Sequence, residues 1–348
     1  TAWDIGVLMS LMQVMRMLTP NLWGALANRL GRRTSIVRLA AALSAAGSLV
    51  FSLAHDFWGL FIGMSILAFF WSASLPLVEA LTLDHLTGQS DRYGRIRLWG
   101  SVGFIAAVLG TGAWLDAAPL GTLPFVILLM LLGVAACAWT LPEAAPRPSP
   151  ESAPMRTILR RPEVVTLLAA CFFMAAAHGP FYVFYSIHLA GHGYGKMAIG
   201  AFWSLGVVAE IAVFMLMPRM MRAWSLSTIL TASFILAVIR FLLIGWFADS
   251  TSLLLLAQLM HGATFGAYHA AAVAALNRWF PAPRHQAHAQ ALYGGISFGA
   301  GGMLGNLVSG EAWESLGPAL TYSLGSVFAA IGLLLVWRGL SSANTTAS

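Results

Sequence analysis

Blocks of about 20 apolar residues follow one another along almost the whole chain, with short polar turns between them. As a helix, each block is long enough to cross a hydrocarbon layer about 30 Å thick. Only 9% of the 348 residues are charged, whereas soluble domains carry about 25% charged residues. In lipid an exposed strand edge leaves backbone groups unsatisfied, so the spans are predicted to be helices. The chain is therefore predicted to be an all-α, polytopic membrane protein.

Hydropathy predicts eleven spans. They lie near residues 4–27, 35–54, 57–83, 96–115, 122–141, 163–188, 197–217, 227–247, 252–275, 287–309 and 318–337. The 19 Lys and Arg residues, except Arg16, Lys196 and Arg240, fall on one side of the alternating loops. The positive-inside rule makes that side cytoplasmic. We therefore expect a multi-pass protein of the inner or plasma membrane, with Thr1 outside and a cytoplasmic C-terminus.

A proline-rich polar segment, 142–162, is predicted to be a cytoplasmic linker. It separates an N-terminal bundle, 1–141, from a C-terminal bundle, 163–338, and a cytoplasmic tail, 339–348, follows. The segment Leu98–Phe104 recurs as Leu292–Phe298 with three of seven residues identical, which indicates a duplication. The two copies are in register only if each bundle has six helices, so we expect that one helix precedes Thr1.

The cytoplasmic turn after the first span has the sequence Gly24-Ala-Leu-Ala-Asn-Arg-Leu-Gly-Arg-Arg33. This segment resembles the signature G-x-L-a-D-R-x-G-R-R of the major facilitator superfamily of transporters. Asn28 stands where the family has Asp, so the charge pairing attributed to that Asp does not carry over directly. The resemblance implies two six-helix bundles around a midplane cavity that opens alternately to either side. It also implies a gating role, in which glycines permit a tight turn and close helix approach, for Gly24, Asn28, Arg29, Gly31, Arg32 and Arg33. The alternative is a plain positive-inside cluster.

Three more segments, 93–104, 204–210 and 261–269, resemble the phenylpropionate permease group, which is related to lactose-permease-type proton symporters. This resemblance implies proton-coupled uptake of a small organic anion such as an aromatic carboxylate. A proton gradient would drive it, without a cofactor. A proton-coupled sugar or nucleoside symporter is the alternative. A membrane enzyme is disfavoured because the loops lack a metal-ligand cluster, phosphate loop or nucleophile elbow, and a sensor would not need buried charges on successive helices.

Charged side chains inside spans cost about 2.5–3.5 kcal/mol each, so those that occur are usually functional. Glu210, Arg240 and the pair His261 and His269 lie on consecutive predicted helices at overlapping depths. His261, Phe265 and His269 share one helix face through their i, i+4, i+8 spacing. We expect Glu210 to alternate between a proton and an ion pair with Arg240, with His261 or His269 tuning it. The alternatives are a purely structural ion pair and histidines that only pack.

A charge count points to the substrate class. Arg16 and Arg240 are two deep cations, whereas Glu210 is the only deep anion. A buried cation without a partner is costly, so a carboxylate substrate would serve as its counter-ion, and aromatic side chains would hold a ring. The predicted substrate contacts are Arg16, His178, Tyr182, Tyr185, Arg240 and Tyr268. Backbone carbonyls around Arg16, and ordinary packing of the aromatic residues, are the alternatives.

Glu79 and Arg97 lie near the cytoplasmic ends of successive helices, where they are predicted either to pair as part of the gate or to reach interfacial water. Glycines of the tenth span, including Gly301 and Gly305, predict close helix packing. Cys137 and Cys171 lie in spans, so neither a disulfide nor a metal site is expected. The net charge of +6 comes from loops without a basic face, so no nucleic acid is expected. The expected partners are a small-molecule substrate, protons and lipid, and the protein is expected to be a monomer.

Overall fold

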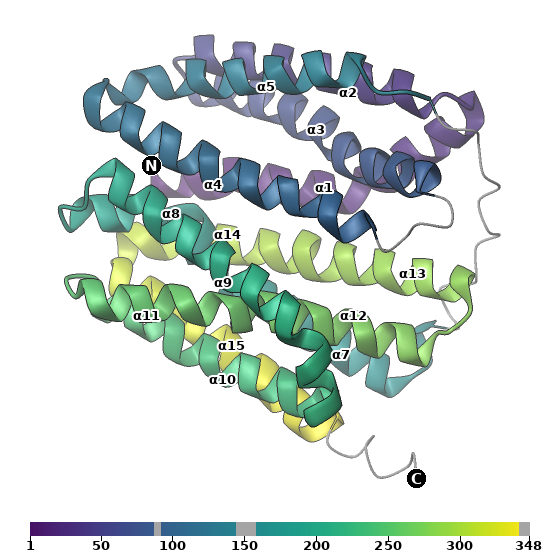
Figure 1. The fold of residues 1–348 in the computed structure, drawn as a ribbon. Coiled ribbons are helices and arrows are strands. Elements are labelled where there is room, and N and C mark those ends of the chain that lie inside the picture. The colour runs from purple at the N-terminus through teal and green to yellow at the C-terminus, as the bar shows by residue number, and fades with distance from the viewer. Residues whose placement is uncertain (87–91, 144–157, 341–348) are drawn as a thin grey trace. The chain divides into compact units, whose positions relative to one another are not determined.

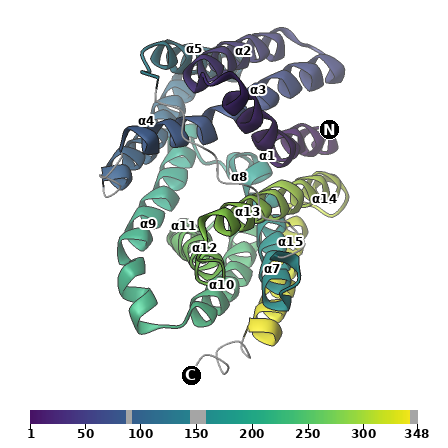
Figure 2. The ribbon, with the colours of Figure 1, turned by 90° about the vertical axis from the view of Figure 1, so that its right-hand side faces the viewer.

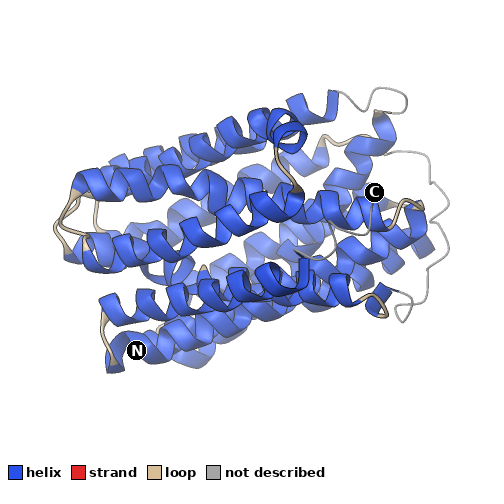
Figure 3. Ribbon diagram, turned by 90° about the horizontal axis from the view of Figure 1, so that it is seen from below, coloured by secondary structure: helices blue, strands red, loops and turns tan. Residues whose placement is uncertain are grey.

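The computed structural model describes residues 1–86, 92–143 and 158–340 (Figure 1). These residues form helices and loops only, as Figure 3 shows, which confirms the predicted all-α class. Their contacts divide the chain into two compact units, Thr1–Ser10 with Pro150–Ser348 (unit 1) and Leu11–Ser149 (unit 2). The predicted boundaries at 141, 162 and 338 remain predictions, and most of the linker and of the tail lies outside the described residues.

Unit 2 is a helical bundle in which α2 packs along both α3 and α5. The helices are α1 (Ala2–Leu30, from Leu11 onward), α2 (Arg33–Leu53), α3 (Phe57–His85), α4 (Tyr93–Ala117) and α5 (Leu123–Trp139), with a short 3-10 turn, η2 (Leu120–Thr122), before α5. A Cβ atom on Gly47 of α2 would lie 2.6 Å from the backbone nitrogen of Leu67 on α3. Only a glycine allows the two helices to approach this closely.

Unit 1 contains the second bundle. Its helices are α7 (Pro162–Ala177), α8 (Gly179–Gly191), α9 (Lys196–Ala223), α10 (Leu226–Trp246), α11 (Thr251–His261), α12 (Tyr268–Trp279), α13 (Pro283–Tyr293), α14 (Gly302–Ser315) and α15 (Pro318–Leu340). Two π-helical segments, η3 (Gly262–Ala267) and η4 (Gly294–Gly301), join α11 to α12 and α13 to α14. In this unit α15 packs along α10 and α7 (Figure 2).

Local sequence signals explain where several helices begin. Asp56 accepts a hydrogen bond from the Gly59 amide at the start of α3, and Ser225 accepts one from Thr228 at the start of α10. These side chains satisfy amides that have no partner inside the helix. Pro162 begins α7, where its missing amide hydrogen costs nothing.

Each of the eleven predicted spans coincides with a helical stretch. Eight stretches in the described part of the chain are long and apolar enough to cross a membrane. The predicted spans 4–27, 252–275 and 287–309 are helical but are not among these eight. The total of eleven spans therefore stays a prediction.

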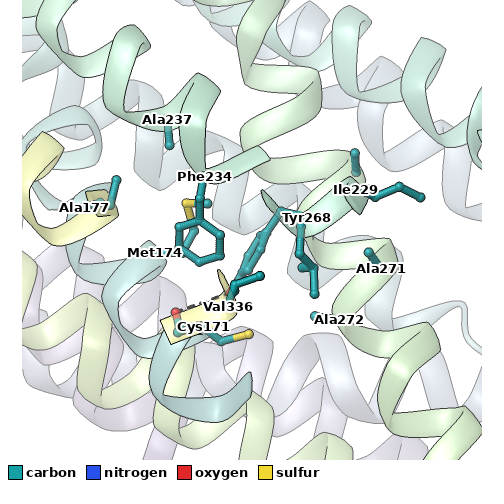
Figure 4. Close-up of a cluster of buried hydrophobic side chains, with 14 of the residues drawn as sticks. Cys171, Met174, Ala177, Ile229, Phe234, Ala237, Tyr268, Ala271, Ala272 and Val336 are labelled. Carbon is teal, nitrogen blue, oxygen red and sulfur yellow. Dashed lines mark hydrogen bonds between the residues drawn. The ribbon is translucent and has the colours of Figure 1, made fainter. Parts of the chain in front are cut away.

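The core of unit 1 is apolar and tightly packed around α7, α10, α12 and α15 (Figure 4). Phe234 and Met174 are almost completely buried there. On α14 and η4, a Cβ on Gly301 or Gly305 would collide with backbone atoms of α7. The close packing predicted for these two glycines is therefore confirmed.

Candidate functional site

The predicted coupling residues Glu210 and His261 meet inside unit 1. His261 Nε2, at the end of α11, lies 2.8 Å from Glu210 Oε1 on α9, and the two side chains are 6% and 17% exposed. An ion pair or a charge-assisted hydrogen bond is strong in such a poorly hydrated environment. The pair is thus able to hold a proton that is shared between a carboxylate and an imidazole.

Arg240 on α10 is completely buried near this pair. Its Nε donates to the carbonyl of Ala257 at 2.9 Å. Its guanidinium carbon lies 4.2 Å from the ring centroid of Phe181 and 5.3 Å from that of Phe241. Cation–π contacts and a carbonyl therefore stabilise a charge that lies deep in the bundle.

The predicted ion pair between Glu210 and Arg240 is not the one that this structure shows. Among the ion pairs of the described residues, Glu210 pairs with His261, and no carboxylate lies within 4.0 Å of Arg240. The alternation of Glu210 between a proton and Arg240 stays a prediction for another conformation.

His178 occupies the break between α7 and α8. Pro180 cannot donate to the preceding turn, so the helix is interrupted there. His178 Nδ1 lies 2.8 Å from the carbonyl oxygen of Met174, to which it donates. The other nitrogen, Nε2, is then an acceptor, and Arg240 Nη1 lies 3.5 Å from it. The local break thus places a neutral imidazole against the buried guanidinium.

A stripe of stacked rings follows the α11–α12 helix. The rings of His261 and Phe265 stack with centroids 5.5 Å apart, and those of Phe265 and His269 stack at 6.3 Å. This arrangement confirms the shared face predicted from the spacing of these residues. The π-helical segment η3 lies within the stripe, and π-helical turns are frequent at functional sites. His269 Nδ1 also hydrogen-bonds the Tyr293 hydroxyl at 2.8 Å.

Tyr182 on α8 presents the most accessible ring of the group. It is 38% exposed and stacks with Trp203 of α9 at 6.2 Å and with His178 at 5.9 Å. Trp203 is itself half-buried, and its Nε1 donates to Ser186 at 3.1 Å. Trp203 was not among the predicted contacts, because no spacing within one helix reveals a partner on another. The three rings form a platform, which we call the aromatic platform, beside the Glu210–His261 pair.

Other predicted substrate contacts have different surroundings. Tyr185 is fully buried. The Tyr268 hydroxyl donates to the Cys171 carbonyl at 3.3 Å and hydrogen-bonds Ser297 at 3.2 Å, which ties three helices together. Arg16 lies on α1 in unit 2, with an exposed side chain. The substrate roles of these residues stay predictions, and Tyr268 has a packing role in this structure.

The predicted gating turn forms a latch within unit 2. Gly31 ends α1 with φ +63°, a left-handed conformation that favours glycine. Arg33 forms an ion pair with Asp84 at the end of α3, and its Nη2 donates to Asn28 at 3.3 Å. Asp84 was missed, because it lies far away in the sequence. Arg29 and Arg32 have exposed side chains.

Gly24 differs from its predicted role in close helix approach. A Cβ on Gly24 would meet no atom of the described residues within 4 Å. Gly24 instead borders a pocket of about 200 Å³ in unit 2. The other residues of this pocket include Trp23, Asn28, Arg33 and Pro76.

Glu79 and Arg97 lie together in unit 2, with 3.6 Å between Glu79 Oε1 and Arg97 Nε. Their side chains are 39% and 51% exposed. An ion pair that is this accessible contributes little to stability. The structure thus shows the predicted pair, and its role in gating stays a prediction.

Comparison with known proteins completes the description. Residues 1–324 match the MFS_1 like family. The chain is 28% identical over 336 residues to the "Probable 3-phenylpropionic acid transporter" of Escherichia coli (strain K12), covering 94% of this chain and 86% of that protein. It is also 28% identical over 351 residues to the maltose permease of Geobacillus stearothermophilus, covering 95% and 85%. The crystal structure of the nucleoside transporter NupG has a TM-score of 0.83 at 16% identity, covering 98% of this chain and 90% of that one.

Proposed function

This chain belongs to the MFS_1 like family, and from that premise we propose that it takes up a small organic anion together with protons. It has the major facilitator fold and is a multi-pass membrane transporter rather than an enzyme. Transport by such a protein needs a site that both faces of the membrane reach in turn. The coupling ion and the substrate class are the proposed part.

The observation that carries the proposal is the buried contact of 2.8 Å between Glu210 and His261. A proton that binds the carboxylate of this pair neutralises it and weakens the contact between Glu210 on α9 and His261 on α11. Release of the proton restores it. Occupancy by a proton therefore changes the relative stability of two arrangements of the bundle, which is what coupling requires.

Arg240 supports an anionic substrate. Its guanidinium is buried, and no carboxylate of the described residues lies within salt-bridge distance. A carboxylate that arrives from solution would supply the missing negative charge. The aromatic platform of His178, Tyr182 and Trp203 would hold a ring beside it. An aromatic monocarboxylate, of the kind that one relative's name specifies, meets both demands.

A neutral sugar or nucleoside is the second candidate. The exposed ring of Tyr182, stacked against Trp203, favours it, because flat apolar faces also bind sugar rings and bases. Relatives named for maltose and for nucleosides support the same class. The two candidates differ in whether the charge of Arg240 is used.

Uptake into proteoliposomes that contain the purified protein tests the proposal. With an inward proton gradient, we expect accumulation of radiolabelled 3-phenylpropionate above the equilibrium level, and loss of that accumulation when a protonophore is added. Maltose, uridine and the neutral amide of phenylpropionate serve as competitors. Stronger competition by any of these neutral compounds than by the acid would favour the second candidate.

We further propose that the protein lies in the inner or plasma membrane with its C-terminus in the cytoplasm and acts as a monomer without a cofactor. The placement of basic residues in one set of loops supports this orientation. The latch of Arg33, Asn28 and Asp84 would then lie on the cytoplasmic side and open once in each transport cycle. Glu79 and Arg97 would form a second contact of this kind.

A further inference from the structure

Five buried polar atoms gather in one part of unit 1 without a hydrogen-bond partner among the described residues. They are Arg240 Nη2, His261 Nδ1, the Tyr185 hydroxyl and both terminal atoms of Gln258, and the last two side chains lie close enough to interact with each other without a well-formed hydrogen bond. As whole residues, Tyr185, Arg240 and Gln258 are 0% exposed and His261 is 5% exposed. Buried polar groups in folded proteins nearly always have a partner, and ordered water supplies it where the protein does not.

The four side chains are neighbours, although they come from three helices. Phe181 contacts three of them, because its ring centroid lies 4.8 Å from that of Tyr185, 5.3 Å from that of His261 and 4.2 Å from the Arg240 guanidinium carbon. Arg240 also donates to the carbonyl of Ala257, the residue before Gln258. The unpartnered atoms therefore belong to a single cluster.

Gly206 on α9 leaves room for this cluster. A Cβ atom there would lie 3.1 Å from Gln258 Oε1 and 3.1 Å from His261 Cδ2. Such contacts are tighter than most Cβ atoms tolerate, so any other residue would push the amide and the imidazole aside. Because Gly206 has no side chain, the Gln258 amide and the His261 ring can both lie directly against the α9 backbone.

The cluster offers both donors and acceptors. Arg240 Nη2 and Gln258 Nε2 donate, Gln258 Oε1 accepts, and the Tyr185 hydroxyl does either. His261 Nε2 faces Glu210, which leaves Nδ1 on the other side of the ring. A water molecule needs two to four polar partners of this mixed kind. An anion would need donors only, which Gln258 Oε1 does not provide.

We propose that Tyr185, Arg240, Gln258 and His261 border an internal water site, and that Gln258 is a positioning residue that holds the His261 imidazole through this water. The imidazole then has Glu210 at Nε2 and water at Nδ1. A proton from bulk solution that is relayed through this water to Nδ1 is matched by one passed from Nε2 to Glu210, so the water is restored, the ring ends neutral in its other tautomer and Glu210 ends protonated. The transport role rests on the proposed function, whereas the water site does not.

The charged and titratable groups around His261 come from each helix that packs against it. They are Glu210 of α9, Arg240 of α10 and His178 at the α7–α8 break, and Tyr185 of α8 lies on the other side of the Phe181 ring. His178 already donates through Nδ1 to Met174, so it offers His261 no N–H from that nitrogen. Water beside Gln258 would give His261 Nδ1 the proton donor that His178 Nδ1 does not.

Hydroxyl-radical footprinting detects bound water directly, because an X-ray pulse produces radicals from water where it is bound. The purified protein is irradiated in H₂¹⁸O and its peptides are analysed by mass spectrometry. Tyr185 and His261 are expected to gain ¹⁸O several-fold faster than Phe234, which is equally buried in the apolar core. In Gln258→Leu, labelling of Tyr185 should fall several-fold. Equal labelling of Tyr185 and Phe234 would overturn the water site, and unchanged labelling in Gln258→Leu would overturn the role of Gln258.

The direction of the change in Tm distinguishes a dry site from a hydrated one independently of the labelling. If the site is dry, removing unpartnered polar atoms stabilises the protein, so Gln258→Leu and Tyr185→Phe would raise the Tm. If water pairs with these atoms, both variants lower the Tm by a few degrees, and we expect this result. Gly206→Ala should lower it too, whereas Gly191→Ala, with open space at its Cβ, should not. A higher or unchanged Tm in both polar variants would contradict the proposal.

Transport separates this inference from the proposed function. Gln258→Leu should shift the pH at which uptake is half-maximal and reduce the solvent deuterium effect on the rate. If Tyr185 is labelled but the protein shows no proton-driven uptake, the water site is supported and the proposed function is contradicted. If uptake is proton-driven but Tyr185 is not labelled, the proposed function is supported and the water site is contradicted.

Discussion

The carboxylate of Glu210 and the imidazole of His261 lie 2.8 Å apart, on helices α9 and α11 that pack against each other. The two residues are 51 positions apart in the sequence, and both are largely withdrawn from water. The contact joins two packed helices through one proton-binding pair. Several consequences for transport can be measured.

Glu210→Gln keeps a hydrogen-bonding side chain but removes the negative charge. Because the amide cannot take up a proton, a proton gradient should no longer drive accumulation, so the internal level should not exceed equilibrium. Exchange of labelled for unlabelled substrate should persist. Uptake with and without an inward pH gradient in proteoliposomes measures both. Glu311→Gln, at an exposed position, is the matched control, and full accumulation in Glu210→Gln would remove Glu210 from coupling.

Arg240→Met replaces the buried cation by an apolar side chain of similar length. Removal of the guanidinium leaves the Ala257 carbonyl and His178 Nε2 without their donor, so the Tm is expected to fall by a few degrees. Binding of 3-phenylpropionate should weaken by at least about tenfold, or about 1.4 kcal/mol. Calorimetric titration and thermal unfolding of the same preparation provide the two readings. Unaltered affinity for the acid would argue against Arg240 as its counter-ion.

Trp203→Leu removes one ring of the aromatic platform but keeps an apolar side chain. An aromatic pair contributes about 0.5–1.5 kcal/mol beyond area burial, so the Kd for a ring-bearing substrate should rise about 2- to 10-fold. Trp224→Leu changes an exposed tryptophan just after α9 and should have no such effect. Equal affinities of the two variants would show that the platform does not contact the substrate.

Gly31→Leu tests the latch. Gly31 has φ +63°, so a leucine there costs about 1–2 kcal/mol and should distort the turn that presents Arg33 to Asp84. Exchange should slow more than binding weakens. Gly121→Leu is the control, because Gly121 is exposed in η2 and its Cβ would face open space. The test measures the rate of substrate exchange and the Kd in both variants. Equal exchange rates in the two variants would rule out a role of the latch in transport.

Gly310→Leu tests the contact between the first turns of α1 and helix α14. A Cβ on Gly310 would lie 2.9 Å from the Ala2 carbonyl oxygen and 3.1 Å from the Gly6 Cα. A leucine should therefore separate these helices, and a cysteine placed at Ser10, which is buried and hydrogen-bonds the Met303 carbonyl of α14, should react faster with a polar maleimide. Gly191→Leu, which meets no atom within 4 Å, is the control. Equal reaction rates would show that Gly310 does not determine how closely α1 and α14 pack.

The sequence alone determined the helical class, the limits of most helices and the turn after α1. These features depend on local causes, namely runs of apolar residues that must satisfy their own backbone groups in lipid and a glycine that accepts a left-handed conformation at position 31. The spacing of His261, Phe265 and His269 likewise placed their rings on one face. The number of residues from the end of each helix also predicted how deep Glu210 and Arg240 lie within the membrane span.

Only the tertiary structure decided which of these groups meet. Glu210 contacts His261, Arg33 contacts Asp84 across 51 residues of sequence, and Trp203 stacks on Tyr182. Depth along a helix restricts the possible partners, but the rotation of each helix about its own axis selects among them. That rotation follows from the packing of whole faces, such as the glycine contacts of η4 and α14 with α7, and no short segment encodes it.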